Sequence, residues 1–587
     1  MLAFQTLLIA VWLLPAVCHS AQLSCTIGQA EMCKAAGTAP GTTLAGLGFD
    51  VVTMKRTQSY VIDVSTWQQN NSCTLCKNPL MKGKLQRLPA AVEKWEPLKL
   101  NMMLSSTVYE SPEAFIMKRN TDVKPGWTVG LNLNTTSLLV GGMQSTAARI
   151  IMAQSKLDKF SFITQEVKCS SYRYSLKQNP PVHPMFVQSI MKLPQQYNNQ
   201  TKPDYIKFLA TFGTHYTHKV DLGGRVKSVT SVQTCKAALD GYTEMEVRNC
   251  LNAEAAARAS VKSTEIKAQA EYCKNALKRH NNKGSFSSTF KQRFTQVVGG
   301  SIGNTTDLLF STEVKPATFR KWKNTLKINP EMISYSLYPL YQLVKDPVKK
   351  KGVKKATEDY ILEHALIKHC SNKCTQGSTP SSHDPCACVC RPTKHITDNC
   401  CPQQLGVAHL TVTVKHATGL WGDMFTQTDG FVRVLMGNQT FQTKVINNNN
   451  NPKWNEDFYL GTVELPLKTK LKFEVWDEDN HWYDQANDLL GSCTKSVEAG
   501  SFTFVCPMNH GNLYFSYKAE CAPGLEGDNC SEYSPFRMKA DILDLYSPRT
   551  SLNVNQDLLV HLRGDQTVVR GNNDVDVQAY LPLPSDL

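Results

Sequence analysis

Aspartate side chains gather in two short stretches, GLWGDMFTQTDGF (419–431) and VWDEDNHWYDQANDLLG (475–491). Each stretch lies at the end of a strand-like segment, which places the carboxylates on loops. Calcium is a hard cation that takes about six to eight oxygen ligands, and aspartates on two neighbouring loops can supply them. In a basic protein, so many carboxylates would repel one another without a cation between them. The sequence therefore predicts a Ca²⁺ site rather than solvated loop carboxylates. The candidate ligands are Asp423, Asp429, Asp477, Asp479, Asp484 and Asp488.

Large apolar side chains flank the same carboxylates. They are Trp421, Met424, Phe425, Trp482 and Tyr483. Any one of them could pack in a core, but exposed aromatic residues beside a cation site suit the headgroup boundary of a bilayer. As a set, they predict a membrane-docking tip.

Two histidines stand close together in YIKFLATFGTHYTH (205–218). His215 and His218 are three residues apart, a spacing that could share a ligand on a helix. Neither an HExxH motif nor a cluster of acidic residues accompanies them. We therefore expect His215 to be a packed or hydrogen-bonded residue.

Residues 299–303, Gly-Gly-Ser-Ile-Gly, fit the G-x-S-x-G nucleophile elbow of esterases and lipases. That elbow needs a helix directly after the serine, whereas NTTDLL follows and opens with a glycosylation acceptor at Asn304. No strand–helix alternation of a parallel sheet surrounds it. The sequence predicts no catalytic residues and no enzyme.

The chain has 20 cysteines, many of them in CSNKC (370–374), CACVC (386–390) and CC (400–401). Zinc sites favour Cys-x2-Cys pairs, and none of these spacings is one. In a secreted chain, a small disulfide-stapled module of epidermal-growth-factor (EGF) type is favoured. One cysteine of the secreted chain is left unpaired or bonded to another molecule.

The elements that position these residues follow from composition shifts along 587 residues, 41% of them hydrophobic. Residues 1–20 read as a cleaved signal peptide, and no later stretch has the ~18 apolar residues of a membrane helix. We expect a large α+β domain at 21–368, the cysteine-rich module at 369–402 and a β-sandwich at 403–520. A C-terminal disulfide loop and a largely disordered tail complete the chain at 521–587.

Secretion also agrees with six Asn-x-Ser/Thr acceptors, at Asn70, Asn134, Asn199, Asn304, Asn438 and Asn529. The net charge of +14 would suit anionic membranes, glycans or nucleic acid. The basic residues are dispersed, however, and the one run, at 345–355, is typical of a solvated helix face or linker. We expect no nucleic-acid partner.

The sandwich resembles a C2 domain in three elements that occur in order. Its first and third loops match the aspartate stretches, and NNNNNPKWNEDF (447–458) matches the Asn-Pro-x-Trp-Asn-Glu element. Relative to the usual third loop, this chain has extra residues before Asp-Leu-Leu-Gly, so Asp484 and Asp488 compete for one ligand position. We expect Asp488 to be the ligand and Asp484 a bystander.

The stretch around His215 resembles the signature of the membrane-attack-complex/perforin family, Tyr-x6-Phe/Tyr-Gly-Thr-His-Phe/Tyr. The matching residues are Tyr205, Phe212, Gly213, Thr214, His215 and Tyr216, followed by Gly223 and Gly224. The resemblance extends through the cysteine-rich module and the C2-type domain to about Cys530. It implies an architectural motif and a bent sheet flanked by two helical clusters.

In that family the clusters unfurl into membrane-spanning β-hairpins when many copies assemble in a ring. The clusters would lie at about 137–160 and 241–285 here. In the second, LNAEAAARASVK (251–262) combines helix-forming residues with period-two alternation, so it can serve in either state. SFSSTFKQRFTQVV (285–298) alternates like an amphipathic strand, and the pairs Gly223-Gly224 and Gly299-Gly300 are candidate hinges or plain turns at strand ends.

The resemblance implies a secreted, calcium-dependent cytolytic protein of killer lymphocytes. It would be stored in the lumen of cytolytic granules and released onto the phospholipid membrane of target cells, where it inserts as a multi-pass β-barrel. Granule proteases could pass through the pore. A non-lytic adhesion or scaffold protein and a C2-targeted lipid hydrolase are the alternatives.

Two cysteine predictions accompany this resemblance. Related chains usually carry a cysteine near KLNMML (99–104) that pairs with the equivalent of Cys169, and this chain has none there. Cys169 is therefore the candidate for the unpaired residue. Cys250 and Cys273 bracket the alanine-rich stretch and could staple two antiparallel helices.

Overall fold

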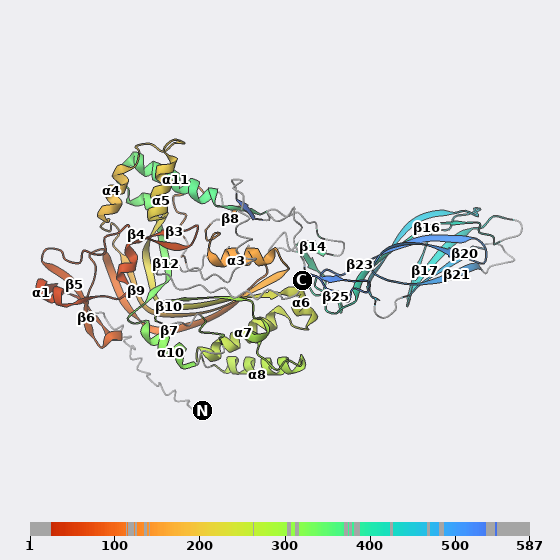
Figure 1. Cartoon of the computed structure of the whole chain (residues 1–587), viewed down its shortest axis with the longest axis horizontal. Helices are drawn as coiled ribbons and strands as arrows, with labels where there is room; N and C mark the ends of the chain where they lie inside the picture. The colour runs from red at the N-terminus through yellow and green to blue at the C-terminus, as the bar shows by residue number, and fades with distance from the viewer. Residues whose placement is uncertain are drawn as a thin grey trace, which may run out of the picture.

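The computed structural model is elongated, with a large α+β body at one end and a β-sandwich at the other (Figure 1). It describes residues 25–112, 114–115, 123, 126–133, 138–139, 141–261, 263–301, 307–311, 316–368, 374, 378–380, 388–422, 426–465, 470–479, 487–535 and 546–548. The predicted signal peptide lies outside these residues, as does most of the predicted tail. Among the described helices, none is long and apolar enough to cross a membrane.

A sheet of long antiparallel strands forms the centre of the body. Its order is β4-β3-β10-β9-β7, and β11 and β12 pair with successive parts of β10. The bounds are β3 (Leu47–Asp50), β4 (Lys55–Tyr60), β7 (Val92–Tyr109), β9 (Phe160–Leu176), β10 (His215–Gln233), β11 (Arg293–Val298) and β12 (Glu331–Pro339). At about 3.3 Å per residue, β10 alone is roughly 60 Å long.

Gly223 and Gly224 lie within β10, not at its end as the sequence pattern suggested. They follow a register shift between Leu222 and Gly223. A Cβ at Gly223 would lie 1.9 Å from the carbonyl oxygen of Cys169, and one at Gly224 would lie 2.6 Å from Trp322. These glycines therefore allow close packing inside the sheet.

Gly299 and Gly300, by contrast, directly follow the end of β11, as predicted. Both have positive φ angles, 78° and 73°. The left-handed conformation that the turn requires is one that glycine adopts at little cost.

Helices cover both faces of the sheet (Figure 1). One face carries α3 (Thr146–Ser155), and the main core continues to α4 (Pro184–Lys192), α5 (Lys202–Phe212) and α11 (Pro347–Glu363). The other face carries α7 (Glu244–Arg258), α8 (Thr264–Arg279), α9 (Phe286–Thr289) and α10 (Pro316–Thr325), with α6 (Thr234–Leu239) at its edge.

Small modules surround the body. An N-terminal sheet has the order β1-β5-β6-β2, and a three-stranded sheet has the order β26-β13-β8. Their bounds are α1 (Ala30–Ala35), β1 (Cys25–Gln29), β2 (Gly37–Thr38), β5 (Ser72–Asn78), β6 (Lys84–Arg87), β8 (Leu138–Leu139), β13 (Leu366–Lys368) and β26 (Tyr546–Pro548). The short strand β26 lies inside the tail that the sequence predicts to be largely disordered.

The predicted sandwich is present as two four-stranded antiparallel sheets, β19-β16-β23-β22 and β18-β17-β20-β21. Its strands are β16 (Val407–Thr418), β17 (Gly430–Met436), β18 (Gln439–Gln442), β19 (Lys453–Glu464), β20 (Lys470–Asp477), β21 (Asp488–Ser496), β22 (Gly500–Pro507) and β23 (Asn512–Cys521). Side chains such as Val412, Val434, Phe473 and Phe515 fill the space between the sheets. The sandwich was expected from four runs of alternating apolar residues, and all four lie in these strands: HLTVTV (409–414), GFVRVLM (430–436), LKFEVWD (471–477) and LYFSY (513–517).

Disulfides staple the cysteine-rich module, which contains β14 (Ser378–Pro380) and β15 (Cys388–Cys390). The described bridges are Cys25–Cys76, Cys33–Cys73, Cys235–Cys401, Cys250–Cys273, Cys374–Cys388, Cys390–Cys400, Cys493–Cys506 and Cys521–Cys530. The pairing of Cys374, Cys388, Cys390 and Cys400 with one another supports disulfides over zinc, and Cys370 and Cys386 lie outside the described residues.

Cys169 is the free cysteine of the described chain, as predicted. Burial raises the pKa of its thiol to about 11.

Candidate functional site

The signature stretch forms the corner between α5 and β10. Tyr205 is fully buried, and its hydroxyl donates to the carbonyl oxygen of Pro194 at 2.8 Å. Gly213 has a φ of 80°, and a Cβ there would lie 2.5 Å from the backbone oxygen of Phe49 in β3. The motif therefore joins a helix to two strands and has an architectural role.

His215 is fully buried in this corner. Its Nδ1 lies 2.8 Å from Thr214 Oγ1, and its Nε2 lies 2.9 Å from the carbonyl oxygen of Trp127. A carbonyl only accepts, so Nε2 carries the proton and Nδ1 accepts from the threonine hydroxyl. Burial lowers the pKa of His215 to about 4, so the ring is neutral. The expected hydrogen-bonded histidine is confirmed, while His218 packs on the ring of Tyr338.

The second helical cluster is the pair α7–α8, stapled by Cys250–Cys273 as the sequence suggested. On α7, Glu246 accepts hydrogen bonds from Tyr272 and Arg279 of α8. Arg248 donates to the backbone oxygen of Ser106 in β7 at 3.1 Å. The pair is thus one unit attached to the sheet through polar contacts, small side chains, and the larger buried side chains of Val247 and Leu251.

The stretch SFSSTFKQRFTQVV is a strand only in its second half, which corrects the sequence interpretation. Its first half forms α9, where Ser285 and Ser288 make a capping box. Glu254 of α7 accepts the backbone N–H groups of Phe286 and Ser287 at 2.8 and 3.1 Å. A carboxylate at a helix N-terminus stabilises the helix, and this contact comes from a distant segment that local periodicity does not report.

The first cluster is α3, on the opposite face of the sheet. Ser145 caps it by accepting from the backbone N–H of Ala148, and Ala147, Ala148 and Ile151 are buried. The range of about 137–160 that was expected to hold the first cluster therefore contains a helix. The two clusters cover opposite faces of one sheet.

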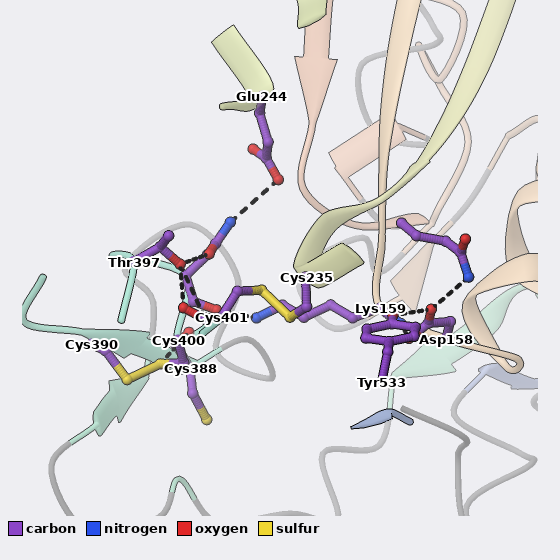
Figure 2. The surroundings of a disulfide bond; sticks show 12 residues. Asp158, Lys159, Cys235, Glu244, Cys388, Cys390, Thr397, Cys400, Cys401 and Tyr533 are labelled. Carbon is purple, nitrogen blue, oxygen red and sulfur yellow. Dashed lines mark hydrogen bonds between the residues drawn. A yellow bond between two sulfur atoms is a disulfide. The ribbon is translucent and has the colours of Figure 1, made fainter. Parts of the chain in front are cut away.

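Both clusters leave the sheet at one junction, shown in Figure 2. Phe160 at the start of β9 pairs with Gln233 at the end of β10, and the N–H of Thr234 donates to the carbonyl oxygen of Lys159 at 3.0 Å. The disulfide Cys235–Cys401 ties this point to the cysteine-rich module. The sequence carries no local signal for this pairing, because its partners are far apart in the chain.

The outer strands end near the same level. Tyr109 at the end of β7 pairs with Phe162, and Arg293 at the start of β11 pairs with Thr230. Four neighbouring strands therefore stop together where the two helical segments begin.

At the outer end of the sandwich, the structure brings several predicted calcium ligands together. Asp477 is 2% exposed, and its Oδ1 accepts the backbone N–H of Asp429 at 2.6 Å. In the strand pair β20–β21, Asp477 stands opposite the exposed Asp488. Asp479 donates its backbone N–H to Asn487 within the third loop. Asp423 and Asp484 lie outside the described residues.

A glycine and an asparagine run shape this cluster. A Cβ at Gly422 would lie 1.8 Å from Asp477 Oδ2, so the carboxylate presses against the first loop beside position 423. Asn448 donates its backbone N–H to Asp429 Oδ1 at 2.6 Å, and Asn450 Oδ1 accepts from the backbone N–H of Thr428 at 3.0 Å. The sequence analysis did not identify Gly422 as a functional residue, although its position next to the candidate ligand Asp423 could have indicated it.

These residues fit a calcium ion by the chemistry of their donors. Asp429 of the first loop donates its backbone N–H to Asp477 of the third, and Asp488 stands opposite Asp477, so carboxylates of two loops lie in one region. Within the described residues, no three His, Cys, Asp or Glu side chains are grouped so that they could hold a metal ion. Asp429, Asp477, Asp479 and Asp488, together with Asp423, stay the candidate ligands predicted from the sequence.

Trp421 is the described member of the predicted docking tip. It is 50% exposed and packs edge-on against His510, with ring centroids 5.0 Å apart. The remaining members, Met424, Phe425, Trp482 and Tyr483, lie outside the described residues.

The other predicted surface features are compatible with the structure. The glycosylation acceptors Asn70, Asn199, Asn438 and Asn529 are exposed, and Asn134 and Asn304 lie outside the described residues.

Ser301 of the G-x-S-x-G match accepts a hydrogen bond from Asn329 and donates its backbone N–H to Thr325. Neither neighbour is a base that could activate a serine.

Comparison with known proteins agrees with this geometry. Residues 38–370 match the MAC/Perforin domain, and residues 408–510 match the C2 domain. Perforin-1 of Rattus norvegicus is 36% identical over 515 residues, which cover 86% of this chain and 92% of the rat protein. Perforin-1 of Mus musculus is 37% identical over 515 residues with the same coverages. Perforin-1 of Homo sapiens is 35% identical over 528 residues, covering 88% of this chain and 93% of the human protein.

A bent sheet with helical clusters on both faces, followed by a C2 sandwich, defines a class of pore-forming proteins that bind membranes. The chain belongs to the MAC/Perforin family. It is a cytolytic pore former and not an enzyme, as the sequence analysis predicts.

Proposed function

We propose that this protein kills target cells by docking on their membranes in a calcium-dependent step. When bound, calcium would neutralise the loop carboxylates and offer coordination positions to lipid phosphate oxygens. Asp429 and Asp477 would hold the ion from the first and third loops, and Asp488 would close the site. Trp421 and its aromatic neighbours would then enter the headgroup region.

Many docked copies would assemble in a ring, and the helical clusters would become β-hairpins. The observation that carries this proposal is the common end of β7, β9, β10 and β11, because four strands can lengthen there in register. Each segment between them exceeds the roughly 20 residues that two membrane strands need. Strands paired in a closed barrel satisfy every backbone hydrogen bond in the bilayer.

The disulfide of the second cluster is compatible with both states. Cys250 and Cys273 have Cα atoms 5.5 Å apart. That distance is about the separation of hydrogen-bonded residues on adjacent antiparallel strands. The bridge can therefore persist while α7 and α8 become two neighbouring strands.

We also propose that the protein is secreted from the cytolytic granules of killer lymphocytes, and its membership of the MAC/Perforin family supports this. Passage of granule proteases through the pore belongs to the same proposal.

Vesicle experiments test this function. Fluorescent-dye leakage from phosphatidylcholine vesicles should need calcium and should occur without lipid hydrolysis, and electron microscopy should show rings. Leakage with hydrolysis would support the lipid hydrolase, and binding without leakage would support an adhesion or scaffold protein.

A further inference from the structure

Beside Lys159 and Glu244, which Figure 2 labels, Asn399 of the cysteine-rich module contacts both helical segments. The amine of Lys159, which directly precedes β9, donates to the backbone oxygen of Asn399. The side chain of Asn399 donates through Nδ2 to Glu244 Oε1 at 3.4 Å, at the first residue of α7. One residue therefore bridges the base of the first cluster and the base of the second.

The bridge is held in a defined orientation. Thr397 donates its hydroxyl to Asn399 Oδ1, which leaves Nδ2 directed at Glu244. Lys159, Glu244 and Asn399 are each partly buried, and charged groups removed from water depend on such partners.

A second contact beside it involves the C-terminal part of the chain. Asp158 is buried and accepts from Tyr533 at 2.6 Å and from Gln233 at 2.9 Å. Tyr533 lies in β25 (Glu532–Tyr533), which pairs with β24 (Leu525–Glu526) just after the sandwich. Segments that follow the pore-forming domain in sequence thus enclose its junction.

The covalent and non-covalent contacts here have different consequences. Cys235–Cys401 cannot open without reductant, so the module must stay attached immediately beyond the end of β10. If β9 and β10 lengthened past Lys159 and Gln233, Lys159 and Glu244 would become part of the longer strands. Both would then leave their present positions beside Asn399. The hydrogen bonds of Asn399, like the one from Tyr533 to Asp158, therefore belong to the part of the attachment that can open and close.

We propose that Asn399 is a positioning residue for the conversion of helices to hairpins. It holds the two clusters at their common base, and its release from Lys159 and Glu244 precedes insertion while Cys235–Cys401 acts as the pivot. This inference rests on the proposed hairpin conversion. The partner that Asn399 recognises is the chain's own lysine–glutamate pair.

The test uses the full-length protein and two readouts. Asn399→Ala removes the amide, and Glu244→Leu removes its acceptor, whereas Glu244→Gln keeps an acceptor oxygen and is the matched control. Amide hydrogen exchange in the soluble monomer is measured at residues 234–247. The lag between vesicle binding and dye leakage is measured at equal amounts of bound protein.

A hydrogen bond to a charged group is strong enough that its loss should speed exchange on the order of tenfold. We expect Asn399→Ala and Glu244→Leu to speed exchange by this factor and to shorten the lag several-fold. The double variant should add little to either, and Glu244→Gln, which keeps the acceptor oxygen without the charge, should change both much less than Glu244→Leu does. A residue with a merely structural role would lower leakage when removed, so the sign separates the two roles.

Unchanged exchange and lag in both variants, or a longer lag at full binding, would overturn the inference. If the wild-type protein binds vesicles but never permeabilises them, the proposed function fails instead. The exchange measurement would then still show whether Asn399 holds the junction.

Discussion

The second helical cluster and the C2 sandwich bury different kinds of side chain. Besides larger residues such as Leu251, α7 buries Ala253, Ala255 and Ala256, and the residues buried on α8 are Cys273 and Ala276. The sandwich buries Val, Leu, Phe and Tyr side chains from both of its sheets. Burying one large apolar side chain contributes about 1.5–3 kcal/mol, and alanine contributes much less.

This difference corresponds to what each region has to do. The sandwich must keep its loops in one geometry while it docks, so a close-packed apolar core suits it. The cluster must leave the sheet, and small side chains with polar anchors such as Arg248 and Glu254 make that departure less costly. Low local stability is expected of elements that move.

The largest effect should come from preventing the cluster from leaving. An engineered cysteine pair joining α7 to β7 beside the Arg248–Ser106 contact should leave docking intact and abolish leakage until reductant is added. Each single-cysteine variant is the control, and wild type with the same reductant shows whether natural bridges interfere. Leakage from the locked protein would mean that α7 does not insert.

Loss of a calcium ligand should come next. Asp429→Asn, Asp477→Asn and Asp488→Asn each remove a charged oxygen, so the calcium needed for half-maximal vesicle binding should rise about tenfold or more. Asp484→Asn should change it little. Calcium titrations of vesicle binding at neutral pH decide this. A large rise in the calcium requirement for Asp484→Asn with little change for Asp488→Asn would show that the third loop is aligned incorrectly with that of other C2 domains.

Core substitutions test the comparison directly. Phe473 is fully buried and stacks on Phe515, with ring centroids 3.8 Å apart. Phe473→Ala should therefore lower the unfolding free energy of the sandwich by about 3–5 kcal/mol. Ala255→Gly should cost α7 only about 1 kcal/mol. Denaturant titrations followed by hydrogen exchange in each region measure both. Equal losses would contradict the difference drawn between the two regions.

The last effect, which appears only below neutral pH, concerns acid. The pKa of His215 falls from 6.5 in the unfolded chain to about 4 in the fold, so below pH 6.5 protons bind the unfolded state preferentially. Stability should therefore fall as pH falls from about 6.5 to 4, by about 3 kcal/mol in total. The His215→Gln variant should be less stable than the wild type at neutral pH. Its stability should depend less on pH between about 6.5 and 4. Thermal unfolding of both proteins across that pH range checks it, and parallel slopes would refute the assignment to His215.

Several local features could be predicted from the sequence. The signature around His215 and the ordered C2 elements were found by their resemblance to known families. A packed or hydrogen-bonded His215 was expected because neither an HExxH motif nor a cluster of acidic residues accompanies it, whereas its partner Trp127 is distant in sequence. The pairing of Cys250 with Cys273 was also accessible, since they bracket one helical stretch. Alternating apolar residues indicated the sandwich strands for the same reason, because side chains alternate between the faces of a strand.

Tertiary structure decided the features that depend on distant partners. Residues 286–289 are helical because Glu254 caps them, although their pattern is that of a strand. Gly223 and Gly224 lie within β10, where Cys169 and Trp322 from other segments leave no room for a Cβ atom. Cys401 pairs with Cys235, and Asn399 reaches two segments at once, through contacts that span much of the chain. The spacing of apolar residues shows which face of a helix or strand is apolar. Which residues pack against that face depends on how the whole chain folds.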